Sequence, residues 1–184
     1  MNGSLFIFPQ DPTSSCELQQ LAALLASMEI SGEPLAEQPD SRVFAAGGNF
    51  PRHVVFAGCS PHLRFEPEHP GDRHFCHVAL LGPFAEPRIL TGENTVKPRC
   101  PHCRARLGDW RERLDTTSLP CPACGQAASA HELDWRQHAA VGRCFIELRN
   151  VFPGEASPSD LLMAELRSVS GQDWRYAWAG MSED

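Results

Sequence analysis

The sequence lacks the motifs by which many nucleotide-binding and hydrolytic enzymes are detected. Its one lysine, Lys97, stands far from any glycine run, so there is no G-x-x-x-x-G-K-S/T phosphate loop and a P-loop ATPase is excluded. The G-x-S-x-G nucleophile elbow, the H-E-x-x-H zinc helix and the G-x-G-x-x-G dinucleotide fingerprint are absent as well. These absences favour a protein that is not an enzyme.

Long apolar runs are also missing. No stretch approaches the roughly 18 to 20 consecutive apolar residues that a membrane-spanning helix requires. The apolar run at residues 5–8 is too short for a signal peptide, and no basic residue precedes it. We therefore expect a cytoplasmic protein without a membrane partner. In that compartment the eight cysteines should serve as metal ligands and buried thiols, with no disulfides.

Charge is distributed unevenly along the 184 residues, whose net charge is −7. Residues 1–96 carry five arginines against eleven acidic residues, and residues 127–184 carry five against nine. Residues 97–126 have the opposite balance, with six basic residues against three acidic ones. Proteins that attract nucleic acid over long range are normally basic as a whole. Nucleic-acid binding through the basic segment therefore stays an alternative that the composition does not favour.

Two Cys-x-x-Cys pairs form the most specific motif. Residues 104–120 separate the pairs, which comprise Cys100, Cys103, Cys121 and Cys124. Two residues between the sulfurs allow a tight turn to direct both thiolates at one ion, so this spacing predicts a single tetrahedral Cys₄ site. We expect one structural zinc ion per chain, with iron less favoured. Four thiolates leave no open coordination position for a substrate or a water molecule.

The Cys-Pro-x-Cys pairs resemble the knuckles of the zinc-ribbon superfamily, which includes rubredoxin-like sites. The resemblance covers about residues 98–130 and implies that each knuckle lies at the tip of a β-hairpin. Gly125 follows the second pair, where a knuckle often needs a positive φ. Strongly oxidising members of the thioredoxin superfamily share the Cys-Pro-His-Cys tetrapeptide of residues 100–103. The matching second pair, and the lack of a surrounding βαβ pattern, favour metal binding over a redox dithiol.

A second candidate site lies in the histidine-rich segment 53–77, which holds five of the eight histidines. A cysteine beside a histidine can act as a nucleophile. Cys59 with His62 is the favoured pair, because both residues follow an expected strand in a turn. Cys76 is the other candidate nucleophile, although it could equally pack in the core while the histidines lie on loops.

The tripeptide Asp-Trp-Arg occurs at 109–111, 134–136 and 173–175. Tryptophan and arginine are enriched in binding hot spots, but tryptophan is also buried on average, and both interpretations stay open. The basic segment predicts an interaction surface for a protein partner. Its candidate contact residues are Arg104, Arg106, Trp110 and Arg111.

Apolar periodicity and turn residues predict an α+β fold. The pattern indicates a strand followed by a helix near each end of the chain, with a Ser14–Glu17 capping box before the first helix and a Ser157 cap before the second. These units predict a mainly antiparallel sheet with two helices on one face, and a ferredoxin-like arrangement is the specific expectation. Residues 1–96 and 141–184 would form this domain, residues 97–130 an inserted zinc ribbon, and residues 131–140 a connecting helix. Residues 33–41 are expected to be a loop.

Overall fold

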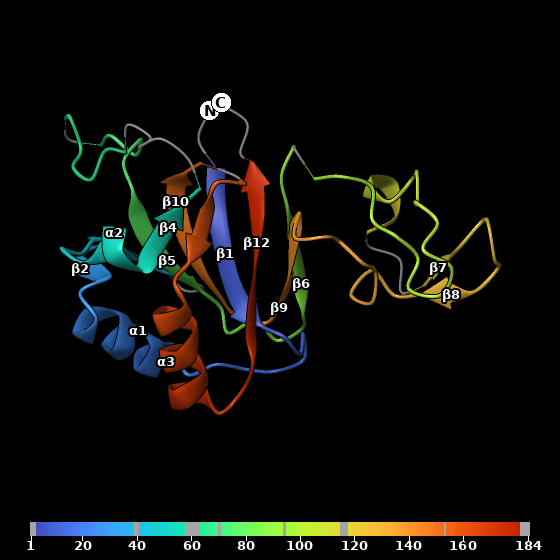
Figure 1. Cartoon of the computed structure of the whole chain (residues 1–184), viewed down its shortest axis with the longest axis horizontal. Coiled ribbons are helices and arrows are strands. Elements are labelled where there is room, and N and C mark those ends of the chain that lie inside the picture. Colours follow the sequence, from blue (N-terminus) through green and yellow to red (C-terminus); the bar gives the residue numbers. More distant parts are fainter. Residues whose placement is uncertain are drawn as a thin grey trace.

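A six-stranded antiparallel sheet forms the centre of the protein (Figure 1). The computed structural model describes residues 3–38, 41–57, 63–69, 71–93, 95–114, 118–152 and 154–180. The strand order is β12–β1–β10–β5–β3–β2, and every neighbouring pair is antiparallel. The six strands are β1 (Gly3–Pro9), β2 (Ser31–Gln38), β3 (Ser41–Ala46), β5 (His77–Leu81), β10 (Phe145–Val151) and β12 (Trp174–Gly180). The prediction of a mixed fold with mainly antiparallel sheets is confirmed at this level.

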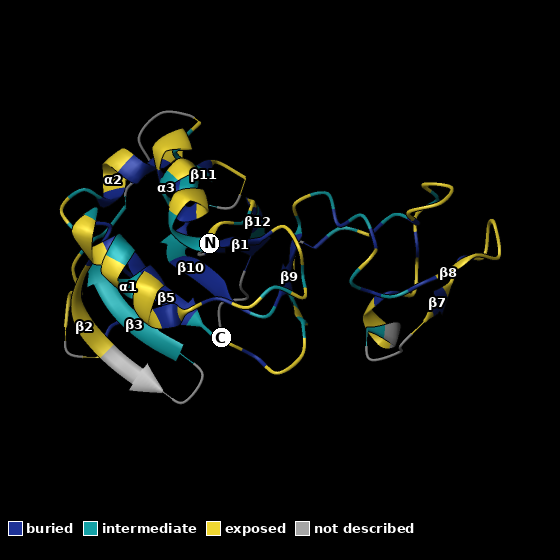
Figure 2. Cartoon of the chain, turned by 90° about the horizontal axis from the view of Figure 1, so that it is seen from below, coloured by how far each residue is buried: buried dark blue, intermediate teal, exposed yellow. Residues whose placement is uncertain are grey.

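Two helices cover one face of the sheet. Helix α1 (Leu18–Ser27) and helix α3 (Asp160–Ser170) each carry a stripe of leucines on the side that faces the strands (Figure 2). Alternate residues of the strands complete this core, among them Leu5, Ile7, Val78, Leu80, Ile146 and Leu148. Full burial of one such side chain stabilises the fold by about 1.5–3 kcal/mol. No helix in the described ranges is long and apolar enough to cross a bilayer.

The opposite face of the sheet is partly covered by a two-stranded antiparallel sheet. Strands β6 (Arg88–Thr91) and β9 (Ala139–Gly142) pair with each other and pack against β1 and β12. Ala140 of β9 and Leu90 of β6 pack there on a cluster of aromatic rings, in which Phe145 contacts Phe6, Phe8 and Phe84. The remaining small elements on the body are α2 (Phe50–His53) and the antiparallel pair β4 (Val54–Phe56) and β11 (Ala156–Pro158).

The two main helices differ in how they begin. In α3 the Ser159 hydroxyl accepts a hydrogen bond from the amide of Leu162 at 3.2 Å, and Gly171 ends the helix with φ 69°. The cap is therefore Ser159, two residues beyond the predicted Ser157. In α1 the predicted capping box is wrong, because the helix begins at Leu18 with no side-chain cap. The Asp11 carboxylate instead accepts from the amide of Thr13 at 2.9 Å and holds the preceding residues in a turn.

Two other local predictions fail. Residues 31–38 form the edge strand β2 instead of a loop, since pairing with β3 overrides the low strand propensity of a proline- and glutamate-containing segment. The connecting helix expected over 131–140 is absent, and β9 occupies residues 139–142. Arg136 and Gln137 have φ values of 49° and 63°, which lie outside the right-handed helical region.

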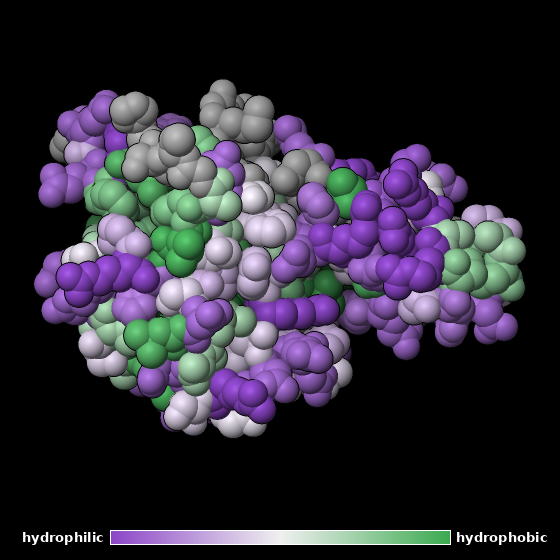
Figure 3. All heavy atoms as spheres, viewed as in Figure 1, coloured by the Kyte–Doolittle hydropathy of each residue, from purple (hydrophilic) through white to green (hydrophobic). Residues whose placement is uncertain are grey.

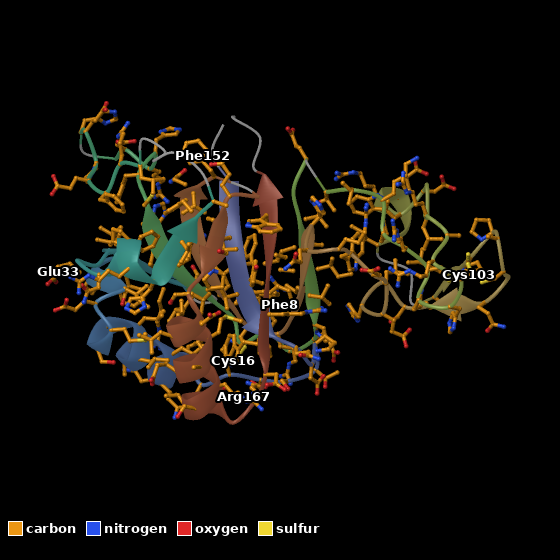
Figure 4. All side chains as sticks on the ribbon, viewed as in Figure 1. Phe8, Cys16, Glu33, Cys103, Phe152 and Arg167 are labelled. Atoms are coloured by element: carbon orange, nitrogen blue, oxygen red, sulfur yellow. A yellow bond between two sulfur atoms is a disulfide. The ribbon has the colours of Figure 1, made fainter. Side chains whose placement is uncertain are left out.

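Cys16 and Cys144 form a disulfide, so the prediction of no disulfides is wrong. The bond joins the segment before α1 to the residue before β10, across a sequence separation of 128 residues (Figure 4). Both residues belong to the main core, with 6% and 0% of their surface exposed. Because the two cysteines are so far apart in the chain, no local sequence pattern indicates that they pair. Structural disulfides are rare in the cytoplasm, so the bond also weighs against the location that we expected.

Replacing Cys16 and Cys144 together by alanine is expected to lower the free energy of unfolding by about 2–4 kcal/mol, because the bond restricts a long loop of the unfolded chain. Urea unfolding followed by circular dichroism measures the loss. Cys76→Ala is a matched control for removal of a buried sulfur. Peptide mapping without reductant should recover Cys16 and Cys144 cross-linked, and recovery of both as free thiols would contradict the assignment.

Candidate metal centre

Four cysteine sulfurs converge at the end of the molecule farthest from α1 and α3 (Figure 4, where Cys103 is labelled). The sulfurs of Cys100, Cys103, Cys121 and Cys124 all lie within 4.8 Å of one another. The closest distances are 3.6 Å between Cys103 and Cys121 and 3.9 Å between Cys100 and Cys124. Four sulfurs bound at about 2.3 Å to one tetrahedral ion stand about 3.8 Å apart. The cluster can therefore hold a metal ion, whereas these distances are too long for disulfide bonds.

The two Cys-x-x-Cys turns have the same backbone geometry. The amide of Arg104 donates to the carbonyl of Cys100 at 2.9 Å, and the amide of Gly125 donates to the carbonyl of Cys121 at 2.8 Å. Arg104 and Gly125 both follow the second cysteine of a pair, with φ values of 62° and 73°. The positive φ expected at Gly125 is thus present. The positive φ at Arg104 could have been predicted by aligning the two Cys-x-x-Cys pairs, because Arg104 occupies the same position as Gly125.

The residues on the two sides of each turn form a short antiparallel pairing. Strands β7 (Leu119–Pro120) and β8 (Ala127–Ala128) flank the second turn, and a bridge between Arg99 and Arg106 flanks the first. A second bridge joins Arg99 to Asp134, so the chain beyond residue 130 adds to the first hairpin. We refer to residues 97–135 as the cysteine module.

Backbone amides around the sulfurs favour thiolates. The amides of Cys103 and His102 lower the pKa of the Cys100 thiol, and those of Ala123 and Cys124 lower the pKa of Cys121 to about 7. At Cys124 the amide of Gln126 has the same effect, but burial and the three neighbouring sulfurs raise the pKa to about 12. Adjacent thiolates repel one another in the absence of a cation. A bound metal ion would remove this repulsion and take the place of the protons.

The cysteine module also has an apolar core of its own. Trp110 packs edge-on against Trp135 with 5.1 Å between ring centroids, and the indole nitrogen of Trp135 donates to the carbonyl of Ala130 at 2.9 Å. The same cluster extends to Val141 in β9 and to Ile89 in β6. The module is therefore packed onto the body through the β6–β9 pair, and a bound metal ion would add to this packing.

The four predicted contact residues fall into two groups. Trp110 is only 3% exposed, and Arg111 donates to the carbonyls of Gly92 and Glu93 at 3.0 and 3.2 Å. Arg104 and Arg106 are exposed instead, and Arg104 makes a 3.3 Å ion pair with Asp134. On the face that Figure 3 draws, hydrophilic side chains gather over the part of the module next to the body, while the far tip is coloured hydrophobic.

The other Asp-Trp-Arg tripeptides follow the pattern of the first. Trp135 and Trp174 are buried. The guanidinium of Arg136 donates to the carbonyl of Lys97 at 3.4 Å, and that of Arg175 lies 5.0 Å from the ring centroid of Phe8. All three tripeptides therefore bury the tryptophan and direct the arginine at the protein itself, which favours the packing interpretation.

Of the three alternative catalytic residues, Cys76 alone lies in the described ranges. Cys76 is fully buried, its sulfur donates to the carbonyl of Asn150 at 3.2 Å, and burial raises the pKa of the thiol to about 12. A thiol held protonated in this way is a poor nucleophile at neutral pH. Cys59 and His62 lie outside the described residues.

Comparison of the chain with protein-family models, with curated proteins and with solved structures gives no match. The function is therefore inferred from the geometry of the chain itself.

Cys121→Ser is expected to lower the metal content from about one ion per chain to near zero, because three thiolates no longer complete the tetrahedral site. Cys76→Ala, which removes a sulfur outside the cluster, should keep the full content. Elemental analysis of the purified proteins measures both. Equal metal content in the two variants would contradict the assignment of the four cysteines.

Gly125→Ala is expected to weaken metal binding about tenfold, because an alanine at φ 73° costs about 1–2 kcal/mol. No atom lies within 4 Å of the added methyl group, so backbone strain is the only cost. Gly108→Ala is the matched control, since its site is equally open and its φ is not in the positive region. Competition with a chromophoric chelator compares the affinities, and equal losses in both variants would refute the strain argument.

Proposed function

We propose that the protein is a zinc-binding protein without catalytic activity, in which the ion fixes an inserted ribbon that presents a protein-interaction surface. The observation that carries the proposal is the convergence of four sulfurs within 4.8 Å. Such a set saturates a tetrahedral ion and leaves no position at which a substrate could be activated. Zinc is favoured because it prefers tetrahedral thiolate sites, and iron in a rubredoxin-like site is the alternative.

The proposed architecture is a ferredoxin-like domain interrupted by the zinc ribbon. The order β12–β1–β10–β5 supports it, because α1 follows β1 and α3 connects β10 to β12, with both helices on the same face. The hairpin formed by β2 and β3 would then be an extension of the sheet beyond β5. The proposed ribbon, residues 97–130, falls between β5 and β10 in the chain.

The proposed contact surface lies on the first knuckle. Arg104 and Arg106 are exposed there, beside the exposed His102, while Trp110 and Arg111 would support them from within the module. The segment 97–126 has a net positive charge, so its partner is expected to present acidic groups. The ion pair between Arg104 and Asp134 is solvent-exposed and contributes little stability, so it can be exchanged for a contact with the partner.

Reversing both charges with Arg104→Glu and Arg106→Glu is expected to weaken capture of the partner about tenfold or more, because like charges would then face each other. The measurement is quantitative affinity purification from the native cells, with bound metal confirmed for each protein. Arg52→Glu on α2 is the matched control.

Proteins that are lost with the double variant and kept with the control would be partner candidates. An identical set of captured proteins with all three baits would argue against the surface. Loss that appears only when nucleic acid is left undigested would favour the nucleic-acid alternative instead.

A further inference from the structure

A pocket of about 530 Å³ lies on the body, apart from the cysteine module. It is formed where the segment 67–75 meets β2, β3 and the first residue of β5. Leu35, Val43 and Phe75 supply apolar walls, and Asp72, Arg73 and His77 supply polar groups. Pockets of this size, with a few placed polar groups, are typical of small-molecule sites.

The segment that forms the pocket is held by buried hydrogen bonds. The Asp72 carboxylate accepts from the amides of Glu68 and His74 at 3.0 and 2.8 Å, and its side chain is only 3% exposed. The side-chain amide of Asn150 in β10 donates to the carbonyls of Arg73 and Phe75 at 2.6 and 2.8 Å. Because both ends of the segment are fixed in this way, the pocket is preorganised.

His77 presents a defined hydrogen-bond acceptor to this pocket. Its Nδ1–H donates to the carbonyl of Phe75 at 2.8 Å, so the unprotonated nitrogen is Nε2. The residue is 5% exposed, and burial, reinforced by Arg149 and Arg73, keeps the pKa of its imidazole below the usual value. Within the described part of the chain Nε2 makes no hydrogen bond.

One cation at the pocket wall makes no ion pair among the described residues. Glu68 and Asp72 both pair with Arg64, with 3.1 Å between Arg64 and Glu68. Arg73 is exposed at the pocket wall and makes no ion pair with any carboxylate in the described ranges. An anionic group entering the pocket would therefore meet a guanidinium that is not already engaged.

We propose that this pocket binds a small organic acid. The carboxylate of the ligand pairs with Arg73, an N–H or O–H next to it donates to His77 Nε2, and an apolar body packs on Leu35, Val43 and Phe75. N-acylated amino acids with an aromatic or branched group have this combination. Binding leaves His77 uncharged and involves no covalent step.

Hippurate serves as the probe, because it has a carboxylate, an amide N–H and a phenyl ring. Titration into the ¹⁵N- and methyl-labelled full chain is expected to shift the Val43 methyl signals and the Nε2 signal of His77. In 3-benzoylpropionate a methylene replaces the N–H, and its affinity should be about tenfold lower, since the buried acceptor is left unpaired. Hippuramide, which lacks the negative charge, should also bind about tenfold more weakly.

Three variants test the residues. His77→Asn keeps a donor for the Phe75 carbonyl but removes Nε2, so hippurate and 3-benzoylpropionate should bind it equally. Arg73→Gln should weaken hippurate about tenfold, while Arg52→Gln on α2 should change nothing. A thermal unfolding transition shows whether each variant is folded. If His77→Asn does not fold, the three ligands and Arg73→Gln still test the proposal. The proposal is overturned if hippurate leaves the Val43 and His77 signals unmoved up to about 10 mM, or if Arg73→Gln and Arg52→Gln bind it alike.

Discussion

The pairing of β10 between β1 and β5 is the constraint on which the rest of the structure depends. β1 is buried on both faces, because Leu5 and Ile7 face the helices while Phe6 and Phe8 face the β6–β9 pair. β10 must therefore enter the sheet in one register, although residues 82–144 separate it from β5. Closing a long loop costs little more than closing a shorter one, so the sheet tolerates such an insertion if its ends are fixed. The β6–β9 pairing and the Cys16–Cys144 bond supply that fixation.

Within the cysteine module, apolar packing and the four cysteines stabilise different parts of the chain. Trp110 and Trp135 build a core that continues into β9, whereas the Cys-x-x-Cys turns lie at the far tip. The turns contain two residues with positive φ and four sulfurs that repel one another as thiolates. Cys100 and Cys121 are buried in this core while Cys103 and Cys124 are exposed, so a bound ion would tie the exposed sulfurs to the packed part of the module. Arg111 adds hydrogen bonds to this contact with the body, because its guanidinium donates to the carbonyls of residues 92 and 93.

Local signals in the sequence predicted those features that local physics determines. Two residues between cysteines define a turn, so the four ligands could be named from spacing alone. A serine near the start of an amphipathic segment and Gly171 at its end located α3 to within two residues. The failures involve contacts that no residue pattern within the segment itself encodes: residues 31–38 form a strand because β3 pairs with them, and Trp110 is buried because Trp135 packs on it. The Cys16–Cys144 bond and the pocket beside His77 likewise join segments that no periodicity connects.

The disulfide and the thiolate cluster place opposite demands on the surroundings of the protein. An environment that keeps Cys16 and Cys144 oxidised would also act on exposed cysteines such as Cys103 and Cys124. The cluster lies at the end of the molecule remote from Cys16 (Figure 4). This separation does not protect it, because an oxidant reaches the exposed sulfurs directly from solvent. Coordination does, because a thiolate bound to a metal is not free to attack a disulfide. With an ion bound to the four sulfurs, the two sets of cysteines would be compatible in one oxidising compartment, because coordination would keep the cluster out of thiol–disulfide exchange.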